Sequence, residues 1–253
     1  MNKTKKPTGY VIYKGPSQLT GEPIVVIALT GSTNRKTGDM VQTYILADNG
    51  ERPTTNQKTG ADEAICGDCK HRPANGGACY VVTAQGPTVV YKSYLAGKYP
   101  ETGLFYNPAA KECEGRMVRL GTYGDPAAVP AIVWFRLLRH AKGNTGYTHQ
   151  WNNPKLDKLD IDFLKSRCMA SVDNPQELKA AQNDNWRTFR VRLETEALQK
   201  RESMCPASDE AGKKLKCETC GLCNGAATNR KGSIAIINHG YTKTRYIAQR
   251  ATA

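Results

Sequence analysis

The chain has 253 residues and a formal net charge of +13, with 36 Lys and Arg against 23 Asp and Glu. This length allows one large domain with a real core, or two small ones. The charge indicates the kind of partner and not the fold, and nucleic acid is the usual partner of so basic a chain. A membrane partner is not expected, because no long apolar run or basic amphipathic helix is present.

The N-terminal segment, MNKTKKPTGYVIYKG, is basic but lacks the apolar stretch of a signal peptide. We therefore expect a cytoplasmic protein in a reducing compartment, where nine cysteines are not expected to form disulfides. Most of them are clustered, which is typical of metal ligands. Cys168 is expected to be a buried structural thiol, and the role of Cys113 is left open.

The chain order of elements predicts an α/β fold. Residues 10–47 hold three short β-branched runs, and residues 50–79 are rich in turns. From CYVVTA at residue 79 to WRTFRVRLE, strand-like and helix-like segments alternate, which favours βα units and a mostly parallel sheet. The chain is too short for eight βα units plus cysteine-rich additions. We therefore expect one compact domain, a partial or degenerate (β/α) barrel, with a β-rich segment at 1–60, a barrel-like core at 61–200 and a Cys-rich metal-binding segment at 201–253.

Two acidic residues stand where a predicted strand ends and a helix begins: Asp125 in GTYGDP and Asp173 in ASVDNP. A lone Asp at such a place is most often a helix N-cap. Two of them in one α/β domain are also candidates for a nucleophile and a general acid or base. Asn174-Pro175 is expected to open a helix. Because the carboxyl ends of parallel strands line the site in such folds, we expect one shared rim. Its members would be Asp125, Tyr147, His149, Gln150, Asp173 and Arg190.

The run GYTHQW gathers a phenol, an imidazole, an amide and an indole. Tyr147, His149 and Gln150 are therefore candidates for stacking on a flat heterocycle and hydrogen-bonding its edge. Arg190, in WRTFRVRLE, is a candidate for phosphate contact. Ordinary strand alternation and a solvated strand face are the alternatives for these two runs.

The segment CETCGLC places Cys217, Cys220 and Cys223 at two successive CxxC steps. Such a turn delivers thiolates to one zinc ion, and the fourth ligand would be Cys205 or His239. Four protein ligands leave no open position, so the predicted role of the zinc is structural. An iron–sulfur cluster uses the same ligands.

A second possible metal site lies in CGDCKHRPANGGACY, with Cys66, Cys69 and Cys79. His71 or Cys113 would be a further ligand. The alternative is a Gly-rich loop with buried thiols, whose basic KHR would also suit phosphate contacts.

The stretches GDCKHRP…CYV, RLGTYGDPAAVP, TGYTHQW, ASVDN, WRTFRV and CPASDEAGKKLKC…CGLC run across residues 66 to 223. In these stretches the chain resembles a bacteriophage-encoded protein family, which implies the cytoplasm of an infected bacterial host as its location. In layout it is also similar to the tRNA-guanine transglycosylases, including those that install 7-deazaguanines in DNA.

This similarity implies a pentosyltransferase that exchanges guanine in DNA, rather than in tRNA, for a modified guanine-type base through a covalent sugar intermediate. It implies a structural zinc on Cys217, Cys220, Cys223 and His239, with Cys205 as the rival fourth ligand. It also implies Asp173 as nucleophile, Asp125 near the exchanged base and Gln150 as a base-reading amide. The first cysteine step here is CxxC where those enzymes have CxC, and their glycine-rich pocket motif is missing.

Two other classes of function remain open. CGDCKHRPANGGACY is similar to the cysteine cluster of radical-SAM-like phage proteins, although the CxxxCxxC spacing is absent. That similarity implies an iron–sulfur enzyme using the group of Cys66. The other class is a non-enzymatic, zinc-stabilised nucleic-acid-binding protein.

Overall fold

The computed structural model describes residues 6–32, 36–103, 106–213, 215–226 and 232–251. Its strands form one nine-stranded sheet in the order β1-β2-β3-β4-β5-β6-β7-β9-β8. The strands are β1 (Gly9–Pro16), β2 (Pro23–Leu29), β3 (Val41–Ala47), β4 (Met117–Tyr123), β5 (Gly143–Thr148), β6 (Met169–Val172), β7 (Thr188–Arg192), β8 (Glu202–Met204) and β9 (Ser233–Ile237).

The three N-terminal strands pair antiparallel, and every pairing from β3 onward is parallel. The predictions of a β-rich N-terminal segment and a mostly parallel α/β sheet are therefore confirmed. The sheet of the described residues is open, with β1 and β8 as its two edges, and does not close into a barrel.

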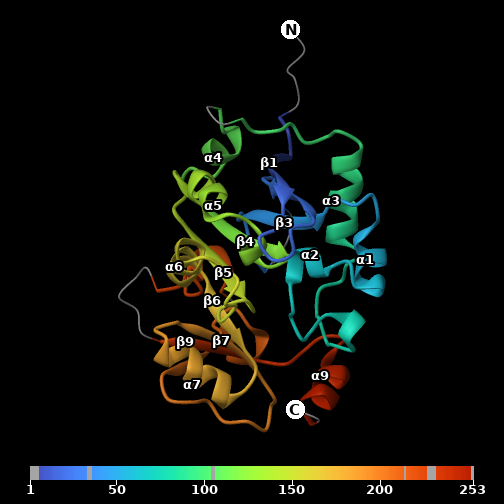
Figure 1. Cartoon of the computed structure of the whole chain (residues 1–253). Coiled ribbons are helices and arrows are strands. Elements are labelled where there is room, and N and C mark those ends of the chain that lie inside the picture. The colour runs from blue at the N-terminus through green and yellow to red at the C-terminus, as the bar shows by residue number, and fades with distance from the viewer. Residues whose placement is uncertain (1–5, 33–35, 104–105, 214, 227–231, 252–253) are drawn as a thin grey trace.

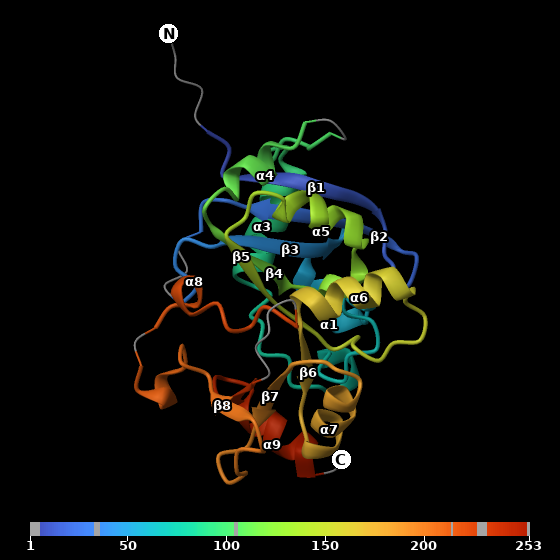
Figure 2. The same ribbon diagram turned by 90° about the vertical axis from the view of Figure 1, so that its left-hand side faces the viewer.

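Helices lie on both sides of the sheet. In Figure 1, α4 to α7 lie toward the left of the ribbon and α1 to α3 toward the right, with α9 below α1, and Figure 2 turns α4 to α6 toward the viewer. The helices are α1 (Pro53–Thr59), α2 (Glu63–Cys66), α3 (Gly86–Leu95), α4 (Pro108–Glu112), α5 (Ala131–Leu138), α6 (Lys158–Arg167), α7 (Pro175–Asn183), α8 (Cys217–Cys220) and α9 (Lys243–Ala251), with short 3₁₀ helices η1 (Pro73–Asn75), η2 (Pro126–Ala128) and η3 (Asp209–Ala211).

The main core lies between the sheet and the helices. Trp134, Leu120 and Ile45 are completely or almost completely buried in it, and Cys113 and Cys168 have no exposed surface. The expectation that Cys168 is a buried structural thiol is confirmed, and Cys113 belongs to the same core. A smaller apolar cluster, which includes Met169, Cys223 and Ile234, lies apart from it.

Local sequence signals account for several element boundaries. The helix start expected at Asn174-Pro175 is confirmed, because the Asn174 side chain accepts a hydrogen bond from Glu177 N at 2.7 Å and Pro175 opens α7. The strand-like run CYVVTA forms no strand. Its first residue, Cys79, instead donates its backbone N–H to the carbonyl of His71 at 2.8 Å, so the run closes a loop.

The sheet is narrowest between β5 and β6. These strands share two register pairs, Tyr147 with Met169 and Thr148 with Ala170, whereas β4 and β5 share four. The sheet is therefore continuous in strand order, but few residues pair between these two strands. We call this point the β5–β6 junction.

Candidate functional site

Polar side chains gather at the carboxyl ends of neighbouring parallel strands. Asp125 follows β4, His149 follows β5 and Asp173 follows β6, as the sequence predicts. The loop of residues 66–79, which follows β3, brings His71 to them, and the rings of His71 and His149 lie 5.4 Å apart. The last helix, α9, closes the group from the other side. We call His71, His149, Asp173 and Tyr246 the polar cluster.

Asp173 is the centre of the polar cluster and is almost completely buried. Its Oδ2 accepts hydrogen bonds from His71 Nε2 at 2.8 Å and Lys70 Nζ at 2.9 Å, and its Oδ1 lies 3.2 Å from Tyr246 Oη. Burial alone would raise the pKa of Asp173, but the hydrogen bond and charge of His71, with the charges of His149 and Lys70, hold it well below the usual range. The carboxyl group is therefore ionised at neutral pH.

The contacts of His71 fix the orientation of its ring. Gln249 Nε2 donates to the carbonyl of Lys70 at 2.9 Å, so the other amide atom, Gln249 Oε1, faces His71 Nδ1 at 3.2 Å. The other ring nitrogen, Nε2, faces Asp173 Oδ2 at 2.8 Å. His71 is thus bound to Asp173 and Gln249, and it is not turned toward the cysteines as a metal ligand.

Asp125 has a positioning role in this structure. It is buried, and its two carboxylate oxygens accept backbone N–H groups from Ala127 at 3.0 Å and His149 at 2.8 Å. Burial raises the pKa of Asp125, and those two hydrogen bonds with the charge of His149 oppose the rise. Asp125 is the N-cap of η2 and also fixes the backbone that carries His149.

Gln150 is engaged within the protein. Its Nε2 donates to the carbonyl of Cys66 at 3.1 Å and to Asp68 Oδ1 at 2.8 Å, and its Oε1 accepts from Asn153 Nδ2 at 2.6 Å. These bonds tie the start of the loop of residues 66–79 to the end of β5. In this structure the amide holds a loop, and reading a base would require it to release these partners.

Tyr147 and Arg190 do not join the polar cluster, so the single shared rim predicted from the sequence is divided. Tyr147 packs on Phe189 with ring centroids 4.6 Å apart and lines a different pocket, described below. Arg190 is fully buried and binds both carboxylate oxygens of Glu202 at 2.8 Å and Glu196 at 3.0 Å. These bonds join β7 to β8 and the segment before it, and leave Arg190 as a structural cation.

Cys66, Cys69 and Cys79, the loop cysteines, interact with one another, and Cys69 also interacts with His71 of the polar cluster. Burial raises the pKa of Cys69 and Cys79 to about 11 and that of Cys66 well above its ordinary value, and the neighbouring thiols add to the rise at Cys66. The charges of Asp125 and Asp173 also reach Cys69. Such thiols keep their protons at neutral pH unless a bound cation displaces them. Cys113 is buried in the main core beside Glu112 and Arg116, so it is not their fourth partner.

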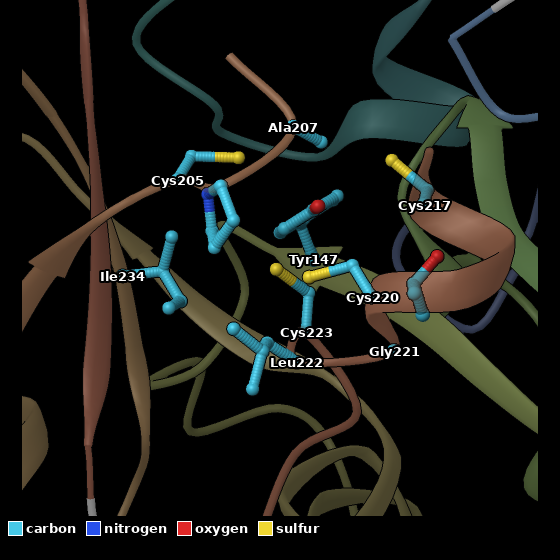
Figure 3. A pocket seen from close by; sticks show the side chains of 11 residues that line it. Tyr147, Cys205, Ala207, Cys217, Cys220, Gly221, Leu222, Cys223 and Ile234 are labelled. Carbon is cyan, nitrogen blue, oxygen red and sulfur yellow. The ribbon is translucent and has the colours of Figure 1, made fainter. Parts of the chain in front are cut away.

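The C-terminal cysteines converge on one small pocket of about 20 Å³. Figure 3 shows Cys205, Cys217, Cys220 and Cys223 around it, with Tyr147 and Ile234. His239 is not among the lining residues; its side chain is 49% exposed and its Nδ1 contacts the carbonyl of Ile237 at 2.8 Å. Of the two fourth ligands left open by the sequence, the structure brings Cys205 to the pocket.

Among the described residues, no three or more His, Cys, Asp or Glu side chains are arranged so that they could already hold a metal ion. A set of four cysteines from two chain segments around one pocket fits tetrahedral zinc in its chemistry, and three cysteines in one loop fit a site with an open position.

Two members of the site have no recognisable local signal in the sequence, whereas Lys70 belongs to the basic KHR run. Tyr246 and Gln249 approach Asp173 or His71 only through folding, and both come from α9, at the far end of the chain. Their spacing of three residues places them on one face of α9, which is the only hint that the sequence offers.

Searches against protein-family models, curated proteins and solved structures found no match. None of the helices in the described ranges combines the length and apolar character that crossing a membrane requires.

Proposed function

We propose that the protein is an enzyme that carries an iron–sulfur cluster on Cys66, Cys69 and Cys79. The observation that supports this most is the position of the loop cysteines: three mutually interacting thiols of one loop stand at the carboxyl ends of the parallel strands, and Cys69 interacts with His71 and Asp173 of the polar cluster. In parallel α/β folds this edge is where ligands bind. A purely structural thiol group would not need an ionised carboxylate and two imidazoles next to it.

The loop cysteines suit such a cluster in number as well as in place. Iron–sulfur clusters are held by cysteine thiolates, most often four, so three would leave one iron position for a ligand from outside the protein. A bound cluster would supply one-electron or radical chemistry. The chain's own residues would hold and orient the substrate: Asp125 fixes the backbone of His149, and Asp173 fixes the ring of His71.

We propose nucleic acid as the substrate class. The formal net charge of +13 supports it, because a basic surface gains affinity from phosphate contacts. Lys70 is the cation at the polar cluster with substantial exposure, at 44% of its side chain, and it lies within reach of a phosphate beside the loop cysteines.

The test is anaerobic purification followed by reconstitution with iron and sulfide. We expect about four irons per chain and a brown chromophore. Both should be lost when Cys66, Cys69 and Cys79 are replaced by Ser. The matched control replaces Cys113 and Cys168, two thiols of the main core, by Ala and should keep the chromophore. Reconstituted protein without bound iron, or iron retained in the triple variant, would overturn the proposal.

Asp173 supports a second candidate, the base-exchange reaction on DNA. An ionised carboxylate at a strand end beside two imidazoles has the charge state that a nucleophile at a sugar carbon requires. In that reaction Asp173 would be the nucleophile, and Asp125 would position His149 as described above.

This second candidate is tested by incubating the protein with duplex DNA and radiolabelled guanine or a 7-deazaguanine. Label should enter the DNA with the native protein and be abolished in Asp173→Asn, while Gln182→Leu, whose amide contacts Ser233 and no member of the polar cluster, should leave it unchanged. Absence of label with every base, or label that persists in Asp173→Asn, contradicts base exchange. If both tests fail, a non-enzymatic nucleic-acid-binding protein is the remaining class.

A further inference from the structure

The C-terminal cysteines come from two parts of the chain that are attached to opposite sides of the β5–β6 junction. Cys205 follows β8 and donates its backbone N–H to the carbonyl of Ala235 in β9 at 2.8 Å. It therefore belongs to the half of the sheet formed by β6, β7, β9 and β8.

The backbone of Cys217 and of Cys223 hydrogen-bonds to the other half, whereas the Cys223 side chain packs in the small apolar cluster of Met169 and Ile234. Arg187, just before β7, also binds the next two residues, Asn224 and Gly225. The carbonyl of Cys223 accepts the N–H of Gly146 in β5 at 3.0 Å, and Cys217 N donates to the carbonyl of Lys36, in the segment before β3, at 3.1 Å. Glu218, within α8, accepts the backbone N–H of Asp39 in the same segment. Helix α8 is thus anchored on β5 and on the segment that precedes β3.

One cation beside the pocket lacks a carboxylate partner. Arg119, in β4, lies over the Tyr147 ring at 5.5 Å, and its charge interacts with those of Cys217 and Cys223. Its contact with Tyr80 Oη is long, at 3.5 Å, and its buried Nε has no hydrogen-bond partner. In the part of the chain that the structure describes, no Asp or Glu forms an ion pair with it. A negatively charged group in the pocket would satisfy this cation.

We propose that Cys205, Cys217, Cys220 and Cys223 bind one zinc ion that fastens the two halves of the sheet across the β5–β6 junction, with Arg119 as its counter-ion. Four thiolates around Zn²⁺ carry a net charge of −2, which is costly in the apolar surroundings of Ile234 and Leu222 unless a cation stands beside it. Arg119 supplies that cation. The β5–β6 junction itself has only two register pairs. Coordination of one zinc ion by Cys205 and the other three thiolates would add a further link between the two halves of the sheet.

This zinc site is independent of the proposed function, which rests on the loop cysteines. The ligands and the counter-ion are different residues from the loop cysteines and from the members of the polar cluster. Each group can therefore be removed without the other, and the two proposals fail separately.

The first test is metal content after growth with zinc. We expect about one zinc per chain in the native protein and in the variant with Ser at all three loop cysteines. Cys205→Ser should lose most of the zinc, and His239→Ala should keep it. Zinc that stays in Cys205→Ser but is lost in His239→Ala overturns the ligand set, and native protein without zinc, or with iron in this pocket, overturns the site.

The second test concerns the fastening, and it needs no substitution that could prevent folding. Hydrogen exchange of the native protein is compared before and after zinc is stripped by a chelator. Exchange should become faster in β6, β7 and β9 while β1 to β3 stay protected. Uniform protection with and without zinc would overturn the fastening.

Arg119 is tested by the affinity for zinc, because groups that support a metal site from outside its ligand set typically change affinity by about 10–100-fold. Arg119→Ala should weaken zinc binding by about tenfold or more, and Arg119→Lys should recover part of the loss. Equal affinity in Arg119→Ala and native protein would remove Arg119 from the proposal.

Discussion

The two cysteine groups differ in what surrounds them, and the difference separates a candidate reactive centre from a candidate structural one. The loop cysteines lie at the edge where parallel strands end, and Cys69 interacts with Asp173 and His71 of the polar cluster. The C-terminal cysteines surround a small pocket lined mainly by apolar side chains and by the half-buried Tyr147, over which Arg119 lies. Cysteine spacing alone does not distinguish these two surroundings. They are distinguished by how many thiols converge on one point and by which polar groups lie beside those thiols.

The largest expected effect comes from stripping zinc from the C-terminal cysteines. Structural zinc in small sites contributes on the order of 10 kcal/mol of binding free energy that is coupled to folding. Thermal unfolding followed by circular dichroism should therefore show a marked drop in Tm after chelation and recovery when zinc is returned. The variant with Ser at the loop cysteines should respond to chelation in the same way. A Tm that does not depend on zinc would contradict a structural zinc site at the C-terminal cysteines.

Next comes Arg190, which ties β8, the strand that leads to Cys205, to β7. Its guanidinium and the Glu202 carboxylate have no exposed surface. Arg190→Met leaves Glu202 buried and unpaired and should cost about 3–5 kcal/mol in the free energy of unfolding. Adding Glu202→Leu should recover part of that loss, as measured by urea denaturation. If the single variant is as stable as the native protein, the C-terminal half does not depend on this pair.

A smaller effect is expected from Asp173, on the side of the loop cysteines. Because the folded protein holds its pKa below the ordinary value of about 4, Asp173 stabilises the fold above that value. This contribution, about 2–3 kcal/mol, is lost progressively as the pH falls from about 5 toward 1. Asp173→Asn should be less stable than the native protein at neutral pH and lose less stability on acidification. Asp162→Asn, on the surface of α6, is the control, and its acid profile should follow that of the native protein.

The smallest effect is expected from Gln150, which holds the loop of residues 66–79 on β5. Gln150→Leu leaves the Cys66 carbonyl and Asp68 without this donor and should cost about 1–3 kcal/mol. It should also lower iron loading on the loop cysteines while zinc on the C-terminal cysteines stays unchanged. Gln182→Leu is a matched control, because that amide makes a long contact with Ser233 Oγ at 3.4 Å. Equal loss of both metals in Gln150→Leu would mean that the two groups are not separate.

Much of the fold could be predicted because its signals are local. Short β-branched runs bounded by turn residues predicted β1, β2 and β3, and Asn174-Pro175 predicted the start of α7. The open sheet could not be predicted. Closure depends on how the last strands pair, and here β8 adds outside β9 and not next to β1.

The site was predictable only in part. Positions at strand ends pointed to Asp125, His149 and Asp173. They did not show that both carboxylate oxygens of Asp125 accept hydrogen bonds from backbone N–H groups. Tyr147 and His149 are two residues apart, a spacing that suggests one face of a strand. Because β5 ends at Thr148, the chain turns between them, and the two rings reach different places. Tyr246 meets Asp173 across 73 residues of sequence, a contact that no local pattern encodes.

The thin β5–β6 junction has a consequence for how the molecule responds to force. Parallel strands that share two register pairs form the weakest seam of the sheet. If the chain is pulled from its two ends, this seam should part first, since forced unfolding follows the rate at which the weakest region opens. Zinc coordinated by Cys205 and by the cysteines of α8 would connect the two sides of this seam. The force of the first rupture in a single-molecule extension experiment would then depend on zinc occupancy.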